Sequence, residues 1–290
     1  MKPASFKYYR PRTVDEALAL LAEYAGDAKP LAGGQSLIPA MNFRLATPAV
    51  LVDLNALGDL AYIKDGPDGL RLGGMTRQRA VERSDMVARQ APLVTETMPF
   101  IAHAAIRNRG TVGGSLAHAD PAAELPAVML ALNARFDLRG SKAARSVAAH
   151  EFFLGLFTTA IEPGELLTDI TIPKTPRRAG FAFQEISRRH GDFALAGAAA
   201  AVALDEQGRC ASARIALFSI GDRPMLAEHA TGILQGQAPS AEAITAAADA
   251  AANTDIDPSS DIHASVKYRR QLANVLTRRV LERAFARAKP

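Results

Sequence analysis

The sequence predicts an α+β protein built from three consecutive parts, covering residues 1–57, 58–175 and 176–290. Three observations support this division. The chain opens with a strand–helix–strand pattern; from about residue 58 it changes to short strands mixed with helices; and a basic, proline-bounded linker then precedes longer strands and two helices. Such changes of periodicity and such proline-rich connections are typical of boundaries between structural units.

The first part is expected to be a small βαβ unit. Thr13 is a suitable N-cap residue, and Glu16 follows three residues later, as in a capping box. The predicted helix ends near Gly26. Buried strands are expected at 29–32 and 50–54, with a helical turn between them at 37–45.

The second part alternates short strands and helices. Thr76 is the expected N-cap of a helix that runs through Val81. The Gly73–Gly74 pair before it is explained as a tight turn. The remaining expected elements are strands at 60–64, 69–73, 134–139 and 166–172 and helices at 92–106, interrupted near Pro99, and 122–132.

The third part follows the linker at 173–178. Its alanine-rich strand, at 194–204, is expected to pack closely against a helix. The C-terminal helix carries an apolar stripe of Leu272, Leu276, Val280 and Ala284, which indicates an amphipathic helix with a solvated basic face or, as the alternative, a partner-docking helix. The other expected elements are strands at 180–186 and 210–219 and helices at 241–252 and 267–288.

Composition restricts the class of protein. A hydrophobic content of 48% and a charged content of 22% are typical of globular proteins, and no apolar stretch reaches the roughly 20 residues of a membrane span. The N-terminus lacks the apolar core of a secretory signal, so a cytoplasmic protein is expected. The net charge of +4 is spread along the chain without a nucleic-acid-binding motif, which argues against nucleic acid. The single cysteine, Cys210, cannot by itself ligate an iron–sulfur cluster.

Two segments share one design, a short strand and a Gly-Gly turn followed by a helix. They are Leu31–Leu37, with Gly33 and Gly34, and Thr111–Leu116, with Gly113 and Gly114. Glycine lets backbone N–H groups converge without a Cβ in the way, so two such turns facing each other suit a diphosphate. Taken singly, each turn is explained as well by ordinary chain reversal. Neither carries the usual nucleotide-loop motifs.

The flanking residues change that assessment, because the sequence resembles a known family over nearly its whole length. It is similar to the FAD-binding medium subunits of bacterial carbon monoxide dehydrogenase-like and xanthine dehydrogenase-like molybdenum hydroxylases. The resemblance rests on motifs that fall in the family's order and spacing: Ala32–Leu37, Arg107–Ser115, Ala119–Glu124 and Arg188–Ala194. It implies a two-subdomain FAD-binding fold of the vanillyl-alcohol oxidase/p-cresol methylhydroxylase type, followed by a C-terminal α+β domain.

The resemblance also implies which residues contact FAD. The two turns match the pyrophosphate- and ribityl-binding segments, with backbone amides as the main donors. Glu124 stands where relatives often have an aspartate that contacts the ribityl hydroxyls, and Lys29 lies near the adenosine end or is a solvated lysine. Ile101 and Leu167 match residues beside the flavin ring. The implied cofactor-binding set is Lys29, Ala32, Gly33, Gly34, Gln35, Ser36, Leu37, Ile101, Thr111, Val112, Gly113, Gly114, Ser115, Glu124, Leu167 and Gln184.

One position departs from the family pattern. Xanthine oxidase relatives have a lysine near the flavin after the phenylalanine that matches Phe183, whereas this chain has Gln184. A cation there would favour anionic reduced flavin. Arg188 and Arg189 are both candidates to supply the charge, and the sequence does not choose between them.

The function implied is electron transfer. In this family a partner with a molybdenum cofactor oxidises the substrate, a partner with [2Fe–2S] clusters relays electrons, and FAD in the medium subunit passes them to an external acceptor; the implied assembly is a dimer of heterotrimers. No catalytic acid, base or nucleophile is assigned here. The alternatives are a stand-alone flavin-dependent reductase or oxidase of the same fold and a non-enzymatic nucleotide-binding scaffold. His118, Asp120 and Glu124 are better explained by flavin contacts and capping than by a metal.

Overall fold

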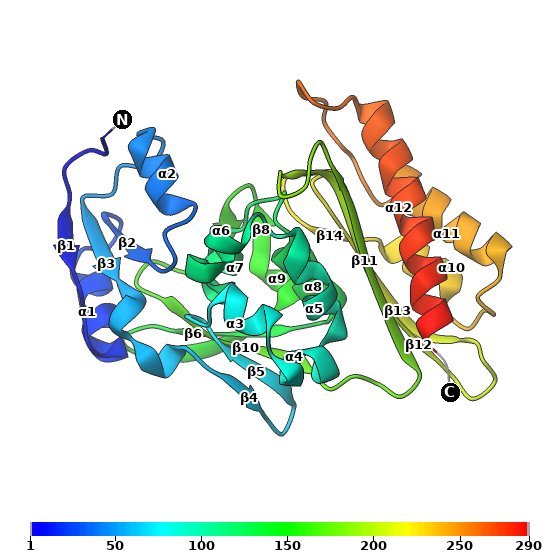
Figure 1. Ribbon diagram of the computed structural model, residues 1–290, viewed down its shortest axis with the longest axis horizontal. Helices are drawn as coiled ribbons and strands as arrows, with labels where there is room; N and C mark the ends of the chain where they lie inside the picture. Colours follow the sequence, from blue (N-terminus) through cyan, green and yellow to red (C-terminus); the bar gives the residue numbers. More distant parts are fainter. Residues whose placement is uncertain (1, 289–290) are drawn as a thin grey trace.

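The structure is a computed structural model that describes residues 2–288. The outer ends of the first and third predicted parts, residue 1 and residues 289–290, lie outside the described residues. The chain forms a row of layers, seen side by side in Figure 1. A small parallel sheet lies at one end, a group of short helices over a five-stranded sheet fills the middle, and a four-stranded sheet backed by three helices closes the other end. The predicted α+β class is confirmed.

The first layer is a three-stranded parallel sheet in the order β1–β3–β2. Helix α1 begins as predicted: the Thr13 side chain accepts from the backbone N–H of Glu16 at 3.2 Å. The apolar face of α1 packs against β3. The elements are β1 (Lys7–Tyr9), α1 (Val14–Glu23), β2 (Ala28–Leu31), α2 (Leu37–Asn42) and β3 (Val50–Asp53), followed by the 3-10 turns η1 (Leu54–Ala56) and η2 (Gly58–Leu60).

The middle layer contains an antiparallel sheet in the order β4–β5–β10–β6–β7. Its strands are β4 (Ile63–Asp65), β5 (Gly69–Gly73), β6 (Arg135–Arg139), β7 (Ala144–Ala148) and β10 (Leu166–Pro173), and a small hairpin adds β8 (Phe153–Gly155) and β9 (Thr158–Thr159). The first predicted strand of this part was placed too early, because Leu60 belongs to η2 and pairing begins only at Ile63.

Short helices cover this sheet. They are α3 (Gln78–Glu82), α4 (Asp85–Gln90), α5 (Pro92–Thr97), η3 (Met98–Phe100), α6 (Ala104–Arg109), α7 (Val112–His118), α8 (Glu124–Ala131) and α9 (Ala149–Phe152). The prediction that Thr76 caps the first of them is wrong. Arg77 is the N-cap of α3. The Thr76 hydroxyl instead donates to the carbonyl of Tyr62 at 2.8 Å and joins the segment after β5 to the segment before β4.

Helix α8 lies between two sheets, and all eight of its residues are buried. On one side it belongs to the same core as β5, β6 and β10; on the other it packs against β12 and β13. This double burial explains why α8 shows almost no amphipathic pattern. It also joins the middle layer to the last layer through one continuous core.

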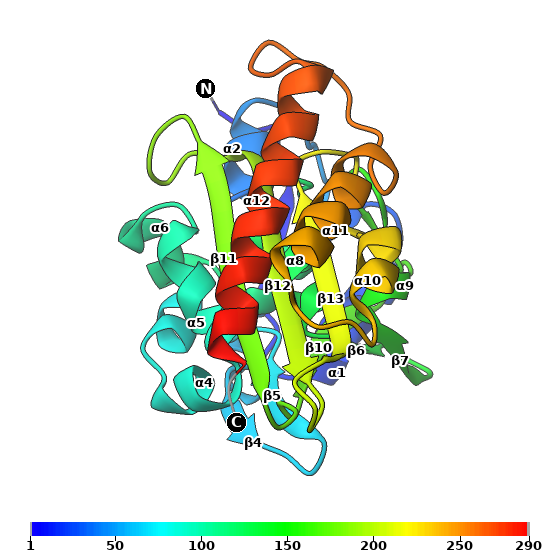
Figure 2. The same ribbon diagram turned by 90° about the vertical axis from the view of Figure 1, so that its right-hand side faces the viewer.

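The last layer is an antiparallel sheet in the order β11–β12–β13–β14, with helices α10, α11 and α12 on its outer face, as Figure 2 shows. Helix α12 packs directly on β11 and β12, which confirms the expected fit of the alanine-rich strand, and its predicted apolar stripe is buried. The elements are β11 (Ala179–Ser187), β12 (Ala194–Leu204), β13 (Cys210–Phe218), β14 (Met225–Leu226), α10 (Glu228–Leu234), α11 (Ala241–Asn253) and α12 (Val266–Arg287). Within residues 2–288, no helix combines the length and the apolar character needed to cross a membrane.

Candidate functional site

The first Gly-Gly turn presents a row of free backbone donors. Strand β2 ends at Leu31, and helix α2 starts at Leu37 without a side-chain cap. The N–H groups of the five consecutive residues 33–37 donate to no other atom of residues 2–288. Gly34 has a φ of +74°, a left-handed conformation that other residues adopt at a cost. Successive free amides in such a turn form a concavity suited to an anion.

The second Gly-Gly turn differs from the first. The N–H of Val112 donates to Thr76 O at 2.9 Å, that of Gly113 to Gly74 O at 3.0 Å, and that of Gly114 to the Thr111 side chain at 3.0 Å. The Ser115 N–H donates to the carbonyl of Thr111. The expectation that these amides serve as main donors is therefore not met, because the cap of α7 and the neighbouring strand already use them.

The two turns nevertheless lie against each other. A Cβ on Gly33 would overlap the carbonyl of Arg109, and a Cβ on Gly114 would come within 3.3 Å of the Ala32 Cβ. Glycine at both positions thus allows the backbones to approach closely. The small parallel sheet and the helices of the middle layer meet at this contact.

The Gly73–Gly74 pair also takes part in this contact. A Cβ on Gly113 would stand 2.5 Å from Gly74 O, and one on Gly74 would overlap the carbonyl of Leu167. The explanation of Gly73–Gly74 as an ordinary turn before a helix was therefore incomplete. The pair lets β5, β10 and the start of α7 pack backbone to backbone.

A network of polar side chains, formed by Asn55 and Arg77, holds the first Gly-Gly turn in place. Asn55 donates its side-chain amide to Ala32 O at 2.9 Å, and its side-chain oxygen accepts from Arg77 at 2.6 Å. Arg77 also donates to the carbonyl of Arg109. Burial, and then the charge of Arg109, lower the pKa of the Arg77 guanidinium. Two positive charges therefore lie close to the free amides, which favours an anionic ligand.

Three further predicted residues lie in the middle layer. Ile101 and Leu167 are each 8% exposed, and Glu124, the first residue of α8, is 9% exposed. Burial raises the pKa of Glu124 to about 7, and the charge of Asp120 adds to this effect. Arg107 donates to the carbonyl of Ile101 at 2.8 Å and so fixes the backbone before α6.

Two predicted residues lie apart from these. Lys29 is exposed on β2, where it pairs with Leu51 of β3, and its side chain makes no hydrogen bond or ion pair with the described residues. Gln184 points to the outer face of β11, where its side-chain oxygen accepts from Arg283 of α12 at 3.1 Å. The structure therefore separates Gln184 from Glu124 by a sheet. Arg188 pairs with Asp192 at 3.0 Å within the β11–β12 connection.

The sequence interpretation missed Glu185, the residue after Gln184. Alternation along β11 places Phe183 and Glu185 on the inner face, toward α8. Glu185 is 8% exposed; burial, and then the charge of Glu124, raise its pKa to about 8. The available signal was a glutamate two residues after the apolar Phe183, on the strand face that alternation turns inward.

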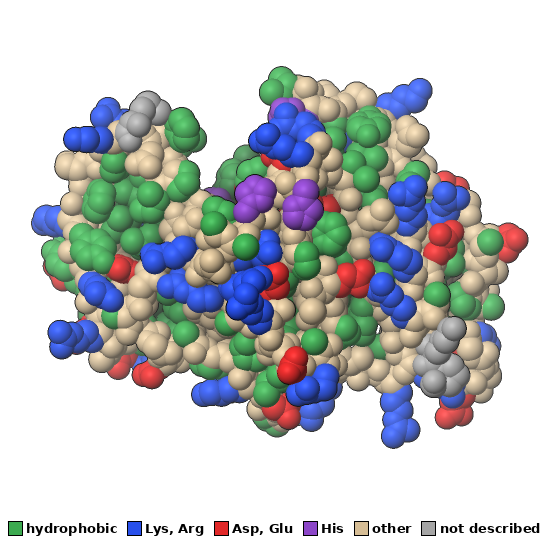
Figure 3. Space-filling model, in the orientation of Figure 1, with side chains coloured by type: hydrophobic (Ala, Val, Ile, Leu, Met, Phe, Trp, Pro, Cys, Tyr) green, Lys and Arg blue, Asp and Glu red, His purple; other side chains and the backbone are tan. Residues whose placement is uncertain are grey.

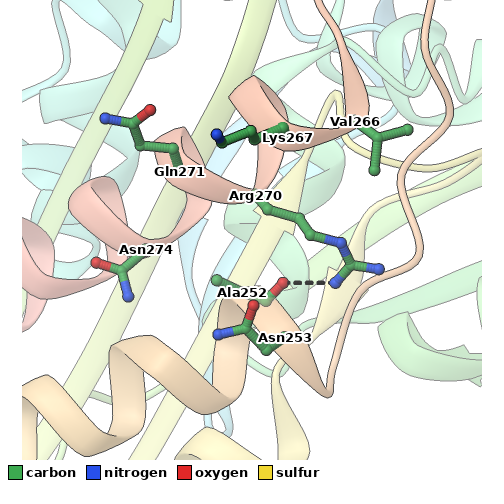
Figure 4. A pocket seen from close by; sticks show the side chains of 7 residues that line it. All are labelled: Ala252, Asn253, Val266, Lys267, Arg270, Gln271 and Asn274. Atoms are coloured by element: carbon green, nitrogen blue, oxygen red, sulfur yellow. Dashed lines mark hydrogen bonds between the residues drawn. The ribbon is translucent and has the colours of Figure 1, made fainter.

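The surface beside the turns is hollowed. Figure 3 shows a notch between the lobe that carries α2 and the body of the molecule. Another depression, of about 600 Å³, lies far from the predicted residues, between α11 and α12. Figure 4 shows its lining, in which Arg270 donates to the carbonyl of Ala252 at 2.7 Å. The described part of the chain gathers no three His, Cys, Asp or Glu side chains that could hold a metal.

Comparison with protein families gives two matches that together cover most of the chain. Residues 4–175 match the family described as "FAD binding domain in molybdopterin dehydrogenase". Residues 181–284 match the family described as "CO dehydrogenase flavoprotein C-terminal domain". The first match contains both Gly-Gly turns and Glu124, and the second contains Glu185.

Similar proteins of known role and structure agree with these matches. The chain is 44% identical to the carbon monoxide dehydrogenase medium chain of Afipia carboxidovorans, covering 100% of both chains. It is 43% identical to the 6-hydroxypseudooxynicotine dehydrogenase complex subunit alpha of Paenarthrobacter nicotinovorans, covering 100% of this chain and 98% of that one. A solved structure of carbon monoxide dehydrogenase from Hydrogenophaga pseudoflava superimposes with a TM-score of 0.96 at 37% identity, covering 99% of each chain.

Proposed function

Because the chain belongs to the family of FAD-binding medium subunits of molybdenum hydroxylases, we propose that the free amides of residues 33–37 hold the diphosphate of FAD. These five N–H groups are the observation that carries the proposal. Each is a hydrogen-bond donor without an acceptor in the described chain, and a diphosphate supplies several charged acceptors at once.

The residues around the turn fit such a ligand. Arg77 and Arg109 add positive charge beside it, and Asn55 fixes the carbonyl of Ala32 so that the following amides face outward. The Thr111–Ser115 segment packs closely against the first turn and offers no free amides of residues 112–115, since these are already bonded. We assign it the role of a wall that positions the first turn.

The other parts of the cofactor are assigned to the middle layer. Glu124 offers a buried carboxyl group for the ribityl hydroxyls, and Ile101 and Leu167 offer apolar contact for the flavin ring. Lys29 remains a candidate for the adenosine end. Gln184 is left out of the proposed set because it bonds to α12 on the outer face of β11.

The chain's role in the complex is to bind FAD and to control its surroundings. When bound, FAD supplies the chemistry of collecting two electrons and passing them to an acceptor. The one cysteine, Cys210, is buried, and burial raises its pKa to about 11, so it offers no exposed thiolate for a cluster. The electrons are therefore proposed to come from [2Fe–2S] clusters of a partner subunit.

The proposed assembly contains a small iron–sulfur subunit, a large molybdenum-cofactor subunit and this chain, arranged as a dimer of heterotrimers in the cytoplasm. The relatives act on substrates as different as carbon monoxide and 6-hydroxypseudooxynicotine, according to their names. This variety supports a substrate site outside the medium subunit. Residues 1–57, 58–175 and 176–290 are retained as the proposed structural units of this chain.

The proposal is tested by the FAD content of two glycine variants. Gly34→Ala forces a left-handed φ on a residue with a Cβ, and Gly114→Val brings side-chain atoms against Ala32. We expect both to purify with little FAD, as measured from the visible flavin absorbance per chain. Gly58→Ala is the matched control, since a Cβ at Gly58 has nothing within 4 Å. Stoichiometric FAD in both test variants would show that the turn does not hold the cofactor.

A further inference from the structure

Glu185 enters the core from the four-stranded sheet. It lies opposite Gly197 of β12, and Gly197 lies opposite Phe218 of β13. Opposed residues of antiparallel strands point to the same face, and Phe218 belongs to the core shared with α8. The Phe218 ring fills the space over Gly197, where a Cβ would overlap it. The Glu185 carboxyl is therefore surrounded by apolar groups.

The Glu185 side chain has no bonding partner in the described residues. Its Oε2 atom is buried and makes no hydrogen bond, although a buried polar atom usually has one. No charged residue occurs in the facing strand β12, and Glu124 is the only charged residue of α8. The charge that raises the pKa of Glu185, after burial, is that of another carboxyl group, Glu124.

Glu124 enters the same space from the opposite side. The backbone N–H of Ser219, which follows Phe218, donates to Pro121 O at 2.9 Å. This bond ties the end of β13 to the loop immediately before α8, and so holds the first residue of α8 close to the inner face of the sheet. Two buried carboxyl groups therefore enter the same core from different elements, and no hydrogen bond joins them.

The cations near this pair are already engaged. Arg107, which acts on Glu124, donates to both carboxylate oxygens of Glu82, at 2.9 and 3.0 Å. From α5, Glu96 accepts from the Phe183 N–H and pairs with Arg287 at 2.5 Å.

The remaining charged groups add no positive charge to the pair. Arg188 is paired with Asp192 in the β11–β12 connection. Asp120 contributes a further negative charge next to Glu124, and burial lowers the pKa of the neighbouring His118, which favours its neutral form. Arg214 of β13 reaches α8 from the same inner face, but it donates to Leu130 O at 3.1 Å, six residues along the helix from Glu124. None of these groups forms an ion pair with Glu124 or Glu185.

We propose that Glu185 is a positioning residue of the FAD site, which keeps one proton on the Glu124–Glu185 pair and thereby makes FAD binding depend on that proton. This inference rests on the proposed function, because Glu124 belongs to the proposed FAD-binding set. A protonated Glu185 carries no negative charge, so Glu124 stays available as an acceptor for ribityl hydroxyls. Two neighbouring carboxyl groups in a buried site cannot both ionise cheaply, and the diphosphate of FAD makes a second negative charge costlier still.

The test is the pH dependence of FAD affinity. The full chain in its complex is stripped of FAD, and the Kd is measured by quenching of flavin fluorescence between about pH 6 and about pH 9. For the wild-type chain we expect the Kd to rise above about pH 8, by up to about tenfold per pH unit. Glu185→Gln, which keeps the shape and cannot ionise, should bind at high pH as the wild type binds at neutral pH.

The matched control is Glu96→Gln, which removes a carboxylate that contacts the same strand but is paired with Arg287. It should keep the wild-type pH dependence. A wild-type slope in Glu185→Gln, or equal weakening at every pH, would overturn the proposed role of Glu185. Absence of FAD binding by the wild type at all pH values would instead overturn the proposed function.

A second measurement does not depend on any variant. FAD is added to the stripped wild-type complex in weak buffer at about pH 8, and the pH is followed with an indicator dye. We expect net proton uptake, because FAD binding raises the proton affinity of the pair. No uptake at this pH would contradict the proposal.

Discussion

The backbone N–H of Gly113 donates to the carbonyl oxygen of Gly74 at 3.0 Å, and a Cβ on Gly113 would stand only 2.5 Å from that oxygen. The start of α7 is therefore pressed against the turn that follows β5. The contact fixes the position of the Thr111–Ser115 segment, which in turn touches the first Gly-Gly turn at Ala32. The close contact at Gly113 therefore helps to set the position of the free amides of residues 33–37.

Gly113→Ala should disturb both stability and cofactor binding. The new methyl group meets backbone rather than a flexible side chain, so the neighbouring segments must move. Overpacking of this kind costs about 1–3 kcal/mol. We expect the free energy of unfolding in urea to fall by that amount and the FAD content to fall with it. Gly232→Ala in α10, where a Cβ has open space, should be neutral or slightly stabilising. Equal stability of the two variants would contradict this account of the glycine contact.

Much of the last layer and the start of the first could be predicted from the sequence because their patterns are local. The strand at 194–204 and the start of α1 behind Thr13 have the bounds or caps expected from composition and capping chemistry. The helices α11 and α12 begin within one residue of their expected starts. In these elements short-range propensity and tertiary packing favour the same structure.

The candidate site was less predictable, because its features depend on contacts between distant segments. The free amides of residues 33–37 and the bonded amides of 112–115 belong to similar sequences. The second set is bonded because Thr76 and Gly74 lie beside it and because Thr111 caps α7. Thr76 was taken for a cap because its type suits one, but the nearby Tyr62 backbone captures its hydroxyl. Likewise, whether Gln184 or Glu185 points toward the candidate site depends on which face of β11 meets α12, and the structure turns Gln184 to α12.

Asn55→Ala should weaken FAD binding more than it weakens the fold. Asn55 connects the carbonyl of Ala32 to Arg77, with bonds of 2.9 and 2.6 Å. Removing a hydrogen-bond partner from part-buried groups costs about 1–3 kcal/mol, and here the loss falls on the turn that presents the free amides. We expect the FAD Kd to rise roughly tenfold or more by fluorescence titration. Asn274→Ala, which removes an exposed bond to Asp249 on α11, is the control and should leave the Kd unchanged.

Arg107→Met should destabilise the middle layer. The Arg107 guanidinium is 8% exposed; it pairs with both oxygens of Glu82 and donates to the carbonyl of Ile101 at 2.8 Å. Removing one partner of a buried ion pair typically costs about 3–5 kcal/mol, and the loss here should lie at or below that range because Glu82 keeps Arg79 as a partner at 2.7 Å. Thermal unfolding should show a clearly lowered Tm.

Arg107→Lys and a double variant refine this prediction. Lysine keeps the charge but cannot reproduce the planar, two-pronged contact, so it should recover only part of the stability. Arg107→Met combined with Glu82→Gln should be no more stable than Arg107→Met alone, because Glu82 still pairs with Arg79 at 2.7 Å. A double variant clearly more stable than the single one would show that Arg79 does not compensate the charge of Glu82.

The stability of the FAD-free protein should fall as pH rises, and Glu185 should cause much of the fall. Burial, and then the charge of Glu124, raise the pKa of Glu185 from 4.5 to about 8 in the folded protein. A group whose pKa is raised on folding contributes stability that is complete below its unfolded pKa and is lost as the pH rises through its folded pKa. The loss should therefore accumulate between about pH 5 and about pH 8 and reach the order of 3 kcal/mol. Residue 185 cannot ionise in Glu185→Gln, so the urea unfolding midpoint of this variant should change less with pH across this window. The control Glu206→Gln, at an exposed position, should follow the wild type. Parallel curves for the wild type and Glu185→Gln would show that this carboxyl does not titrate in the folded protein as its burial requires.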